Sequence, residues 1–206
     1  MKKTYCGYVS IIGKPNVGKS TILNSILEKK VSITSRKSQT TRNNIIGIKN
    51  IAEYQMIFTD TPGMHLGMSK PMNKILNKSA ASIIEDADII LFVLQRLKFN
   101  DEDNKVLEKI IESNKKTICL INKVDQIRDK NKLLPYIKEL SNKHRFAEII
   151  PISAISNGEI IKVVEAIKKY LPMGKHIYDE SLEFNKNKKD IFLASEIIRE
   201  KIIRLM

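Results

Sequence analysis

The chain has 206 residues, of which 42% are hydrophobic and 29% are charged, and its formal net charge is +13. This length suits one domain with a sizeable core and an additional segment, and the composition is that of a soluble globular protein. The longest apolar stretch, 89–94, is far shorter than the ~18 residues that a membrane span needs, and no signal-peptide cleavage site precedes Lys14. We therefore expect a cytoplasmic protein without a membrane-spanning segment.

The two cysteines and three histidines lie too far apart in sequence for a metal site or a redox pair. Cys6 and Cys119 each lie within an apolar run and are expected to be core thiols. His65, His144 and His176 form no cluster, so we predict no bound transition metal.

The positive charge is unevenly distributed, because residues 1–50 contain ten Lys or Arg and a single acid, Glu28. Such an imbalance favours binding to polyanions, which include nucleotide phosphates, RNA and an anionic membrane surface. The chain is also rich in Lys, Ile and Asn throughout, as a biased codon pool would produce. Charge alone therefore does not decide between these two explanations.

Strand-like and helix-like patterns alternate along the chain, which predicts an α/β fold with a mostly parallel sheet. The predicted strands are 5–12, 45–49, 54–59, 89–94, 117–121 and 147–152. The second and third of these are close enough in sequence to form a hairpin, which would make one edge strand antiparallel. We thus expect a six-stranded sheet with helices on both faces.

The predicted helices are 21–27, 72–87, 101–113, 130–143 and 156–171, with an interruption of the fourth near Pro135. The polar segment 29–44 has no periodicity and is predicted to be a long loop.

Composition changes at 172–174, after which the polar stretch 179–189 indicates a linker. Residues 190–206 have the pattern of an amphipathic helix, which cannot bury its apolar face alone. It either docks on the first domain or begins a second one. We therefore predict a domain over 1–172, a linker over 173–189 and the first helix of an incomplete domain over 190–206.

The segment between the first strand and the first helix matches the phosphate-binding pattern G-x-x-x-x-G-K-[ST], with the sequence Gly13-Lys14-Pro15-Asn16-Val17-Gly18-Lys19-Ser20. The two glycines allow the backbone N–H groups and the helix N-terminus to point at phosphate oxygens. Lys19 would reach the β- and γ-phosphates, and the Ser20 hydroxyl would bind Mg²⁺. The alternative is a glycine turn followed by an unrelated Lys-Ser, which the flanking strand and helix disfavour.

The predicted strand 54–59 leads into Asp60-Thr61-Pro62-Gly63. A carboxylate there can hold Mg²⁺ through water, and the Gly63 N–H can sense a γ-phosphate. A D-x-x-G sequence alone is more often a structural turn, but forty residues after a phosphate loop it indicates a nucleotide-binding site.

The strand 117–121 is followed by Asn122-Lys123-Val124-Asp125. Asp125 can accept two hydrogen bonds from N1–H and the amine of guanine, a donor pair that adenine lacks. Asn122 would tie the loop together and approach N7, and the Lys123 stem would lie along the base. After the last strand, Ser153 would brace the loop and the Ala154 N–H would donate to guanine O6. A helix-capping turn is the alternative for an isolated N-K-x-D.

These motifs, in this order and spacing, are those of the translation-factor-like GTPases, and with the segment 35–42 they resemble the Era family of bacterial GTPases (the Era/TrmE-like GTPases). Residues 192–201 are similar to the opening helix of that family's C-terminal KH-type RNA-binding domain. The resemblance implies a P-loop NTPase fold of the Ras-like G-domain type. It also implies Mg²⁺-dependent GTP hydrolysis to GDP and phosphate, acting as a switch in assembly of the small (30S) ribosomal subunit and maturation of 16S rRNA. A monomeric cytoplasmic protein with peripheral contact to the inner membrane is the corresponding expectation.

The resemblance also assigns roles to individual residues. Thr41 is expected to complete the Mg²⁺ shell with Ser20 and Asp60, with Thr40 as the second choice. Asn16 would help to place K⁺, or would instead cap the loop. Lys19, Thr41 and Gly63 are the expected catalytic groups. The expected GTP contacts are Gly13, Lys14, Pro15, Asn16, Val17, Gly18, Lys19, Ser20, Asp60, Thr61, Pro62, Gly63, Met64, Asn122, Lys123, Asp125, Ser153 and Ala154.

Two departures qualify this expectation. Met64 follows Gly63 where Ras-like enzymes place a glutamine that orients water, so intrinsic hydrolysis should be slow; His65 is expected to be a surface residue. No G-x-x-G loop, with which KH domains grip nucleic acid, occurs after residue 172. The alternative function is therefore a guanine-nucleotide-binding module with negligible turnover and lost RNA binding. A P-loop kinase is a weaker alternative, because it needs no guanine box and the chain shows no Arg-rich lid.

Overall fold

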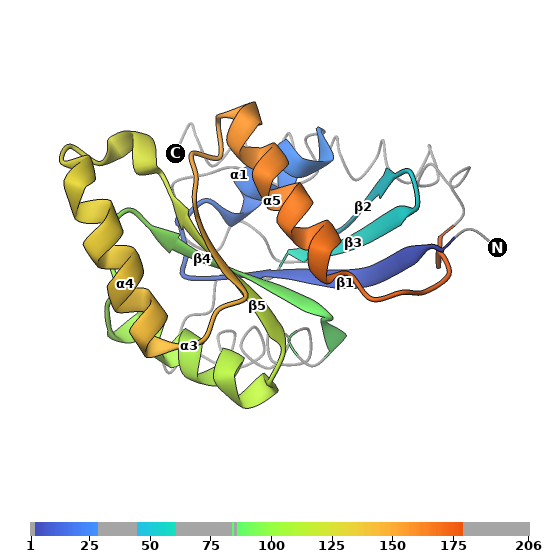
Figure 1. The fold of residues 1–206 in the computed structure, drawn as a ribbon, viewed down its shortest axis with the longest axis horizontal. Helices are drawn as coiled ribbons and strands as arrows, with labels where there is room; N and C mark the ends of the chain where they lie inside the picture. Colours follow the sequence, from blue (N-terminus) through green and yellow to red (C-terminus); the bar gives the residue numbers. More distant parts are fainter. Residues whose placement is uncertain (1–2, 29–44, 61–83, 85, 179–206) are drawn as a thin grey trace, which may run out of the picture.

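The computed structural model describes residues 3–28, 45–60, 84 and 86–178. Six strands form one sheet in the order β2-β3-β1-β4-β5-β6 (Figure 1). β2 and β3 are antiparallel, and every other neighbouring pair is parallel. The predicted mostly parallel sheet with one antiparallel edge strand is confirmed. The strands are β1 Tyr5–Ile12, β2 Ile45–Ile51, β3 Tyr54–Asp60, β4 Ile89–Gln95, β5 Lys116–Asn122 and β6 Glu148–Pro151.

Helices cover both faces of the sheet, as predicted. α1 and α5 lie on one face, and α3 and α4 lie on the other (Figure 1). The helices are α1 Lys19–Leu27, α3 Asp101–Ser113, α4 Leu133–Lys143 and α5 Asn157–Tyr170, with short 3₁₀ turns at Val124–Gln126 and Lys130–Lys132. None of the described helices is long and apolar enough to cross a membrane.

The core consists of two apolar clusters, one on each face of the sheet. β4 contributes to both, because successive side chains of a strand point to opposite faces. Leu91 belongs to the cluster that contains Ile22 of α1 and Val163 of α5, whereas Phe92 belongs to the cluster that contains Ile110 of α3. This double burial explains why β4 is a continuous apolar run.

Both cysteines are free and buried, which confirms that they are core thiols. Burial raises the pKa of the Cys119 thiol far above its ordinary value, so the thiol stays protonated. The described residues contain no group of three or more His, Cys, Asp or Glu that could hold a metal ion.

The predicted interruption near Pro135 is wrong. α4 runs unbroken from Leu133 to Lys143, and Pro135 is its third residue. In the first turn a backbone N–H has no partner within the helix, so a proline there removes no helical hydrogen bond.

Residues 171–178 follow α5 and pack along the sheet. The Cys6 N–H donates to the Pro172 carbonyl at 3.1 Å. The buried Gln55 side chain of β3 accepts from the N–H groups of Ile177 and Tyr178, at 2.8 and 3.0 Å. The predicted loop 29–44, most of the predicted helix 72–87 and the predicted helix 190–206 lie outside the described residues.

Candidate nucleotide-binding site

The phosphate loop, residues 13–20, connects β1 to α1 with an unusual backbone path. Gly13 and Gly18 have φ values of 156° and 106°, and Asn16 has a φ of 65°. A Cβ atom at Gly13 would lie 2.5 Å from the Val93 carbonyl oxygen, and one at Gly18 would lie 2.2 Å from Asn122 Nδ2. Both positions therefore require glycine for conformation and for space.

The N-terminus of α1 opens directly from this loop. Its N-cap is Gly18, and no side chain caps it. The first N–H groups of a helix lack partners within the helix and favour anions. The loop and the helix end together are thus suited to phosphate groups.

Lys19, the first residue of α1, is buried beside the loop. Its Nζ donates to the carbonyl oxygens of Gly13 at 3.2 Å and Lys14 at 2.9 Å. The ammonium group is therefore held against the same backbone whose N–H groups would surround a phosphate.

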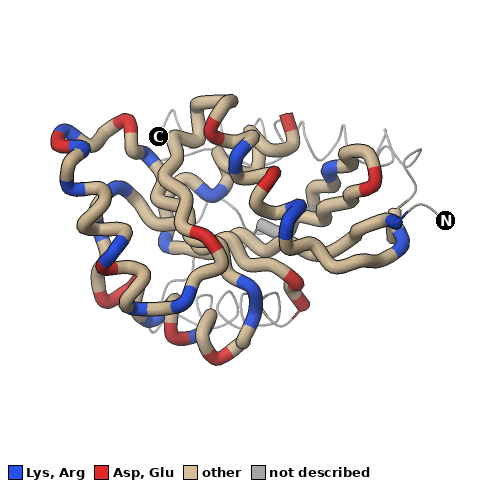
Figure 2. The backbone as a smooth tube through the Cα atoms, in the orientation of Figure 1, with Lys and Arg blue, Asp and Glu red and all other residues tan. Residues whose placement is uncertain are grey.

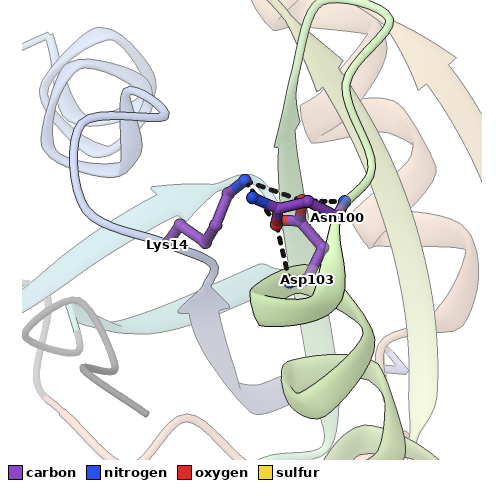
Figure 3. Close-up of polar contacts among 3 residues, drawn as sticks. All are labelled: Lys14, Asn100 and Asp103. Atoms are coloured by element: carbon purple, nitrogen blue, oxygen red, sulfur yellow. Dashed lines mark hydrogen bonds and ion pairs between the residues drawn. The ribbon is translucent and has the colours of Figure 1, made fainter. Parts of the chain in front are cut away.

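The side chain of Lys14 is directed to the start of α3 (Figure 3). Its Nζ lies 2.7 Å from Asp103 Oδ2 and 3.0 Å from Asn100 Oδ1. The Lys14 ammonium group was predicted to contact the nucleotide, but in this structure it bonds to residues at the start of α3.

Asn122, at the end of β5, joins three loops. Its Nδ2 donates to the Val17 carbonyl of the phosphate loop at 2.8 Å, and its Oδ1 accepts from the Ala154 N–H after β6 at 3.0 Å. The side chain is 1% exposed. The predicted role in tying the loops together is therefore present in the geometry, and both ends of the amide are engaged.

We expect Asn122→Ala to lower the free energy of unfolding by about 2–4 kcal/mol, since the Val17 carbonyl and the Ala154 N–H would each lose a buried partner. Urea denaturation of the nucleotide-free chain measures this change. Asn104→Ala is the matched control, because Asn104 is exposed on the surface of α3 and its side-chain amide donates to Glu108 Oε1. Equal unfolding midpoints for the two variants would contradict the role of Asn122.

Asp125 is oriented by the loop after β6. Ser153 Oγ donates to Asp125 Oδ1 at 2.6 Å, which leaves the other carboxylate oxygen to other donors. The Ser153 N–H in turn donates to a carboxylate oxygen of Glu159 in the first turn of α5. Glu159 was not among the predicted site residues; an acid in the first turn of a helix was the signal available, but it is also typical of ordinary capping.

Two residues that were predicted to contact the base make hydrogen bonds within the protein. The Ala154 N–H bonds to Asn122 Oδ1, so guanine O6 would have to share this donor or displace that oxygen. The Lys123 Nζ donates to the Asn16 carbonyl at 2.8 Å, so its stem bridges from β5 to the phosphate loop. These contacts place the predicted base-reading and phosphate-binding segments side by side.

The oxygen donors predicted for Mg²⁺ come from adjacent elements. Ser20 lies in the first turn of α1, after β1. β3 ends at Asp60, whose backbone is in register with Ile11 of β1. Hydroxyl and carboxylate oxygens are the donors that Mg²⁺ prefers, so this set fits the ion. The side chain of Asp60 and the predicted site residues Thr40, Thr41, Thr61, Pro62, Gly63, Met64 and His65 lie outside the described residues.

Comparison with known proteins agrees with this geometry. Residues 8–123 match the family model described as "50S ribosome-binding GTPase". GTPase Era from Glaesserella parasuis is 47% identical over 206 residues, which cover 100% of this chain and 68% of the relative. The chain belongs to the Era GTPase family. GTPase Era from Actinobacillus pleuropneumoniae is likewise 47% identical over 202 residues, covering 98% of this chain and 66% of the relative.

Solved structures of Era have the same fold. A substituted Era from Aquifex aeolicus, bound to GDP and aluminium fluoride, superimposes with a TM-score of 0.89 at 39% identity, covering 98% of this chain and 68% of that one. Era in complex with MgGDPNP and nucleotides 1506–1542 of 16S ribosomal RNA gives 0.87 at 40% identity, covering 96% and 67%. The Ras-like G-domain fold is confirmed. This chain spans about two thirds of the length of its Era relatives.

Proposed function

We propose that this chain binds GTP and hydrolyses it to GDP and phosphate with Mg²⁺. The observation that supports this most is the Asn122 side chain, which joins the phosphate loop to the loop after β6. The same arrangement brings the carboxylate of Asp125 beside Ser153. Phosphate-binding and guanine-reading groups therefore form one continuous site.

Each part of the site has its own proposed role in binding or hydrolysing GTP. The loop amides and the N-terminus of α1 bind the phosphates, and Lys19 balances charge that develops on them. Asp125 selects guanine. Ser20, Asp60 and Thr41 would hold Mg²⁺, which when bound neutralises phosphate charge; the Gly63 N–H is the proposed γ-phosphate-sensing group. Asn16, whose side chain is exposed in the phosphate loop, is the proposed K⁺ contact.

We further propose that the GTP and GDP states differ in affinity for the small ribosomal subunit, so that the chain acts as a switch in subunit assembly and 16S rRNA maturation. The solved complex of Era with MgGDPNP and 16S ribosomal RNA supports this proposal.

A cytoplasmic location, with peripheral contact to the inner membrane, is proposed from the family and the net charge of +13. Figure 2 shows that Lys and Arg positions alternate with Asp and Glu positions along the described backbone.

The direct test is GTP hydrolysis by the purified chain with Mg²⁺, in K⁺ and in Na⁺ buffer. We expect slow phosphate release that needs Mg²⁺ and is faster in K⁺. Absence of release under every condition, despite GTP binding, would favour the module with negligible turnover.

Binding of a 16S rRNA fragment is measured separately, with GDPNP or GDP over a salt series. Binding that depends on the nucleotide would support the switch. Binding that is equal in both states and is lost steeply with salt would instead indicate a purely electrostatic surface.

A further inference from the structure

The ammonium group of Lys14 is part of a compact polar cluster at the first turn of α3 (Figure 3). Asn100 is the N-cap of that helix, and its side chain accepts from the Asp103 N–H at 3.3 Å. Asp103 Oδ2 accepts from the Asn100 N–H at 3.0 Å, which completes a capping box. Lys14 Nζ contacts the acceptor oxygens of both residues. The lysine is therefore fixed to a rigid element, the end of a capped helix.

This ion pair is shielded from water. The Asp103 side chain is 0% exposed and that of Lys14 is 15% exposed. The second carboxylate oxygen, Asp103 Oδ1, is buried without a hydrogen-bond partner among the described residues. A buried carboxylate is costly unless it is paired, so Lys14 and Asp103 hold each other in place strongly.

The backbone of Lys14 belongs to the phosphate loop at the point where Lys19 is held. The Lys14 carbonyl accepts from Lys19 Nζ at 2.9 Å, one residue after the Gly13 carbonyl that accepts from the same group. Anchoring the Lys14 side chain to α3 thus fixes the backbone that carries the contacts of Lys19.

We propose that Lys14 is a positioning residue, through which Asp103 and Asn100 hold the phosphate loop in its nucleotide-binding conformation. This inference rests on the proposed function as a GTP-binding protein. The loop has three residues at positive φ, which an unanchored chain would rarely adopt together. Preorganisation by α3 spares the nucleotide the cost of ordering the loop. The anchor therefore strengthens binding of the phosphates without contacting them.

A direct contact between the Lys14 ammonium and a phosphate is the competing explanation, and the two make opposite predictions. If Lys14 touches phosphate, removing the Asp103 charge frees the lysine and leaves affinity unchanged or improved. If Lys14 acts through Asp103, loss of either partner weakens binding, and loss of both is no worse than loss of one.

The experiment measures GDP and guanosine binding to the complete chain by calorimetry, for Lys14→Met, Asp103→Asn and the double variant. We expect each single variant to bind GDP about tenfold more weakly, with the double variant within about twofold of the weaker single. The ratio between the affinities for GDP and guanosine should fall in parallel, because only the phosphates are affected. Lys14→Arg should retain binding, since arginine can also pair with the carboxylate.

Asp101→Asn is the matched control, because Asp101 is exposed in the same first turn and its loss changes the charge at the α3 N-terminus equally. We expect it to bind GDP as the parent chain does. Thermal melting identifies a temperature at which each variant is folded. If Asp103→Asn does not fold, Asn100→Ala takes its place, because Asn100 supplies the other oxygen that Lys14 contacts. Weakened GDP binding in that variant supports the anchor, and unchanged or tighter binding overturns it.

Unchanged GDP affinity in Asp103→Asn, or additive losses in the double variant, would overturn the inference while leaving the proposed function intact. Failure of the parent chain to bind GDP would instead refute the proposed function, and this inference with it.

Discussion

Lys19→Ala is expected to reduce kcat/KM for GTP by about 100-fold or more. Loss of one preorganised donor to developing negative charge costs about 10²–10³ in rate in comparable sites. The substitution also removes the hydrogen bonds from Lys19 Nζ to the carbonyls of Gly13 and Lys14, so the phosphate loop loses two contacts as well. Steady-state phosphate release measures the effect, and GDP binding separates loss of affinity from loss of turnover.

Lys162→Ala provides the control for this substitution. Lys162 is exposed on α5, and alanine there removes the same charge from a helix. It should hydrolyse GTP at the parent rate. If Lys19→Ala hydrolysed GTP as well as Lys162→Ala does, the assignment of residues 13–20 as a phosphate loop would be rejected.

The sheet and its order of elements were accessible from the sequence because they depend on local patterns. The run at 89–94 is apolar at every position, so it predicted a strand buried on both faces, and β4 is one. The antiparallel edge followed from the short separation between 45–49 and 54–59, which allows only a hairpin.

The prediction at Pro135 was wrong because the rule that proline interrupts a helix does not hold in the first turn of a helix. Proline disrupts a helix where its missing N–H would have bonded within the helix and where its ring clashes with the carbonyl four residues earlier, and neither effect arises in the first turn. The prediction began the helix at residue 130, which put Pro135 inside it, whereas the structure has a 3₁₀ turn over Lys130–Lys132 and begins α4 at Leu133. The error thus lay in the helix boundary.

The site could be predicted where a sequence motif assigns a role to a residue, and not where no motif links two partners. The tying role of Asn122 followed from the N-K-x-D pattern, and the structure has the Asn122–Val17 bond across 105 positions of sequence. The Lys14–Asp103 pair had no such pattern: an acid in a first helical turn is ordinary, and nothing local reveals that a lysine in another loop reaches it. A contact between distant residues that no motif links, such as the Lys14–Asp103 pair, therefore could not be predicted from the sequence.

Asp125→Asn is expected to weaken GTP binding by about a thousandfold. The carboxylate would accept two hydrogen bonds from guanine, each charge-assisted and worth about 1.5–3 kcal/mol, and 1.4 kcal/mol corresponds to a factor of ten. An amide offers one acceptor and one donor in the same place. Xanthine presents a carbonyl where guanine presents its amine, so it complements the amide. We therefore expect XTP to bind the variant better than GTP does.

Competition between GTP and XTP for the purified chain measures this reversal of preference. Asp129→Asn is the matched control: Asp129 lies four residues later, and its carboxylate accepts from the Asn131 N–H, so its replacement alters only that turn. It should retain the preference for GTP. Because Ser153 Oγ also donates to Asp125, the variant keeps an acceptor for that hydroxyl and the loop should remain in place. A reversal with unchanged thermal stability would thus report base recognition alone, whereas unchanged GTP affinity in Asp125→Asn would remove the basis for assigning guanine specificity to this loop.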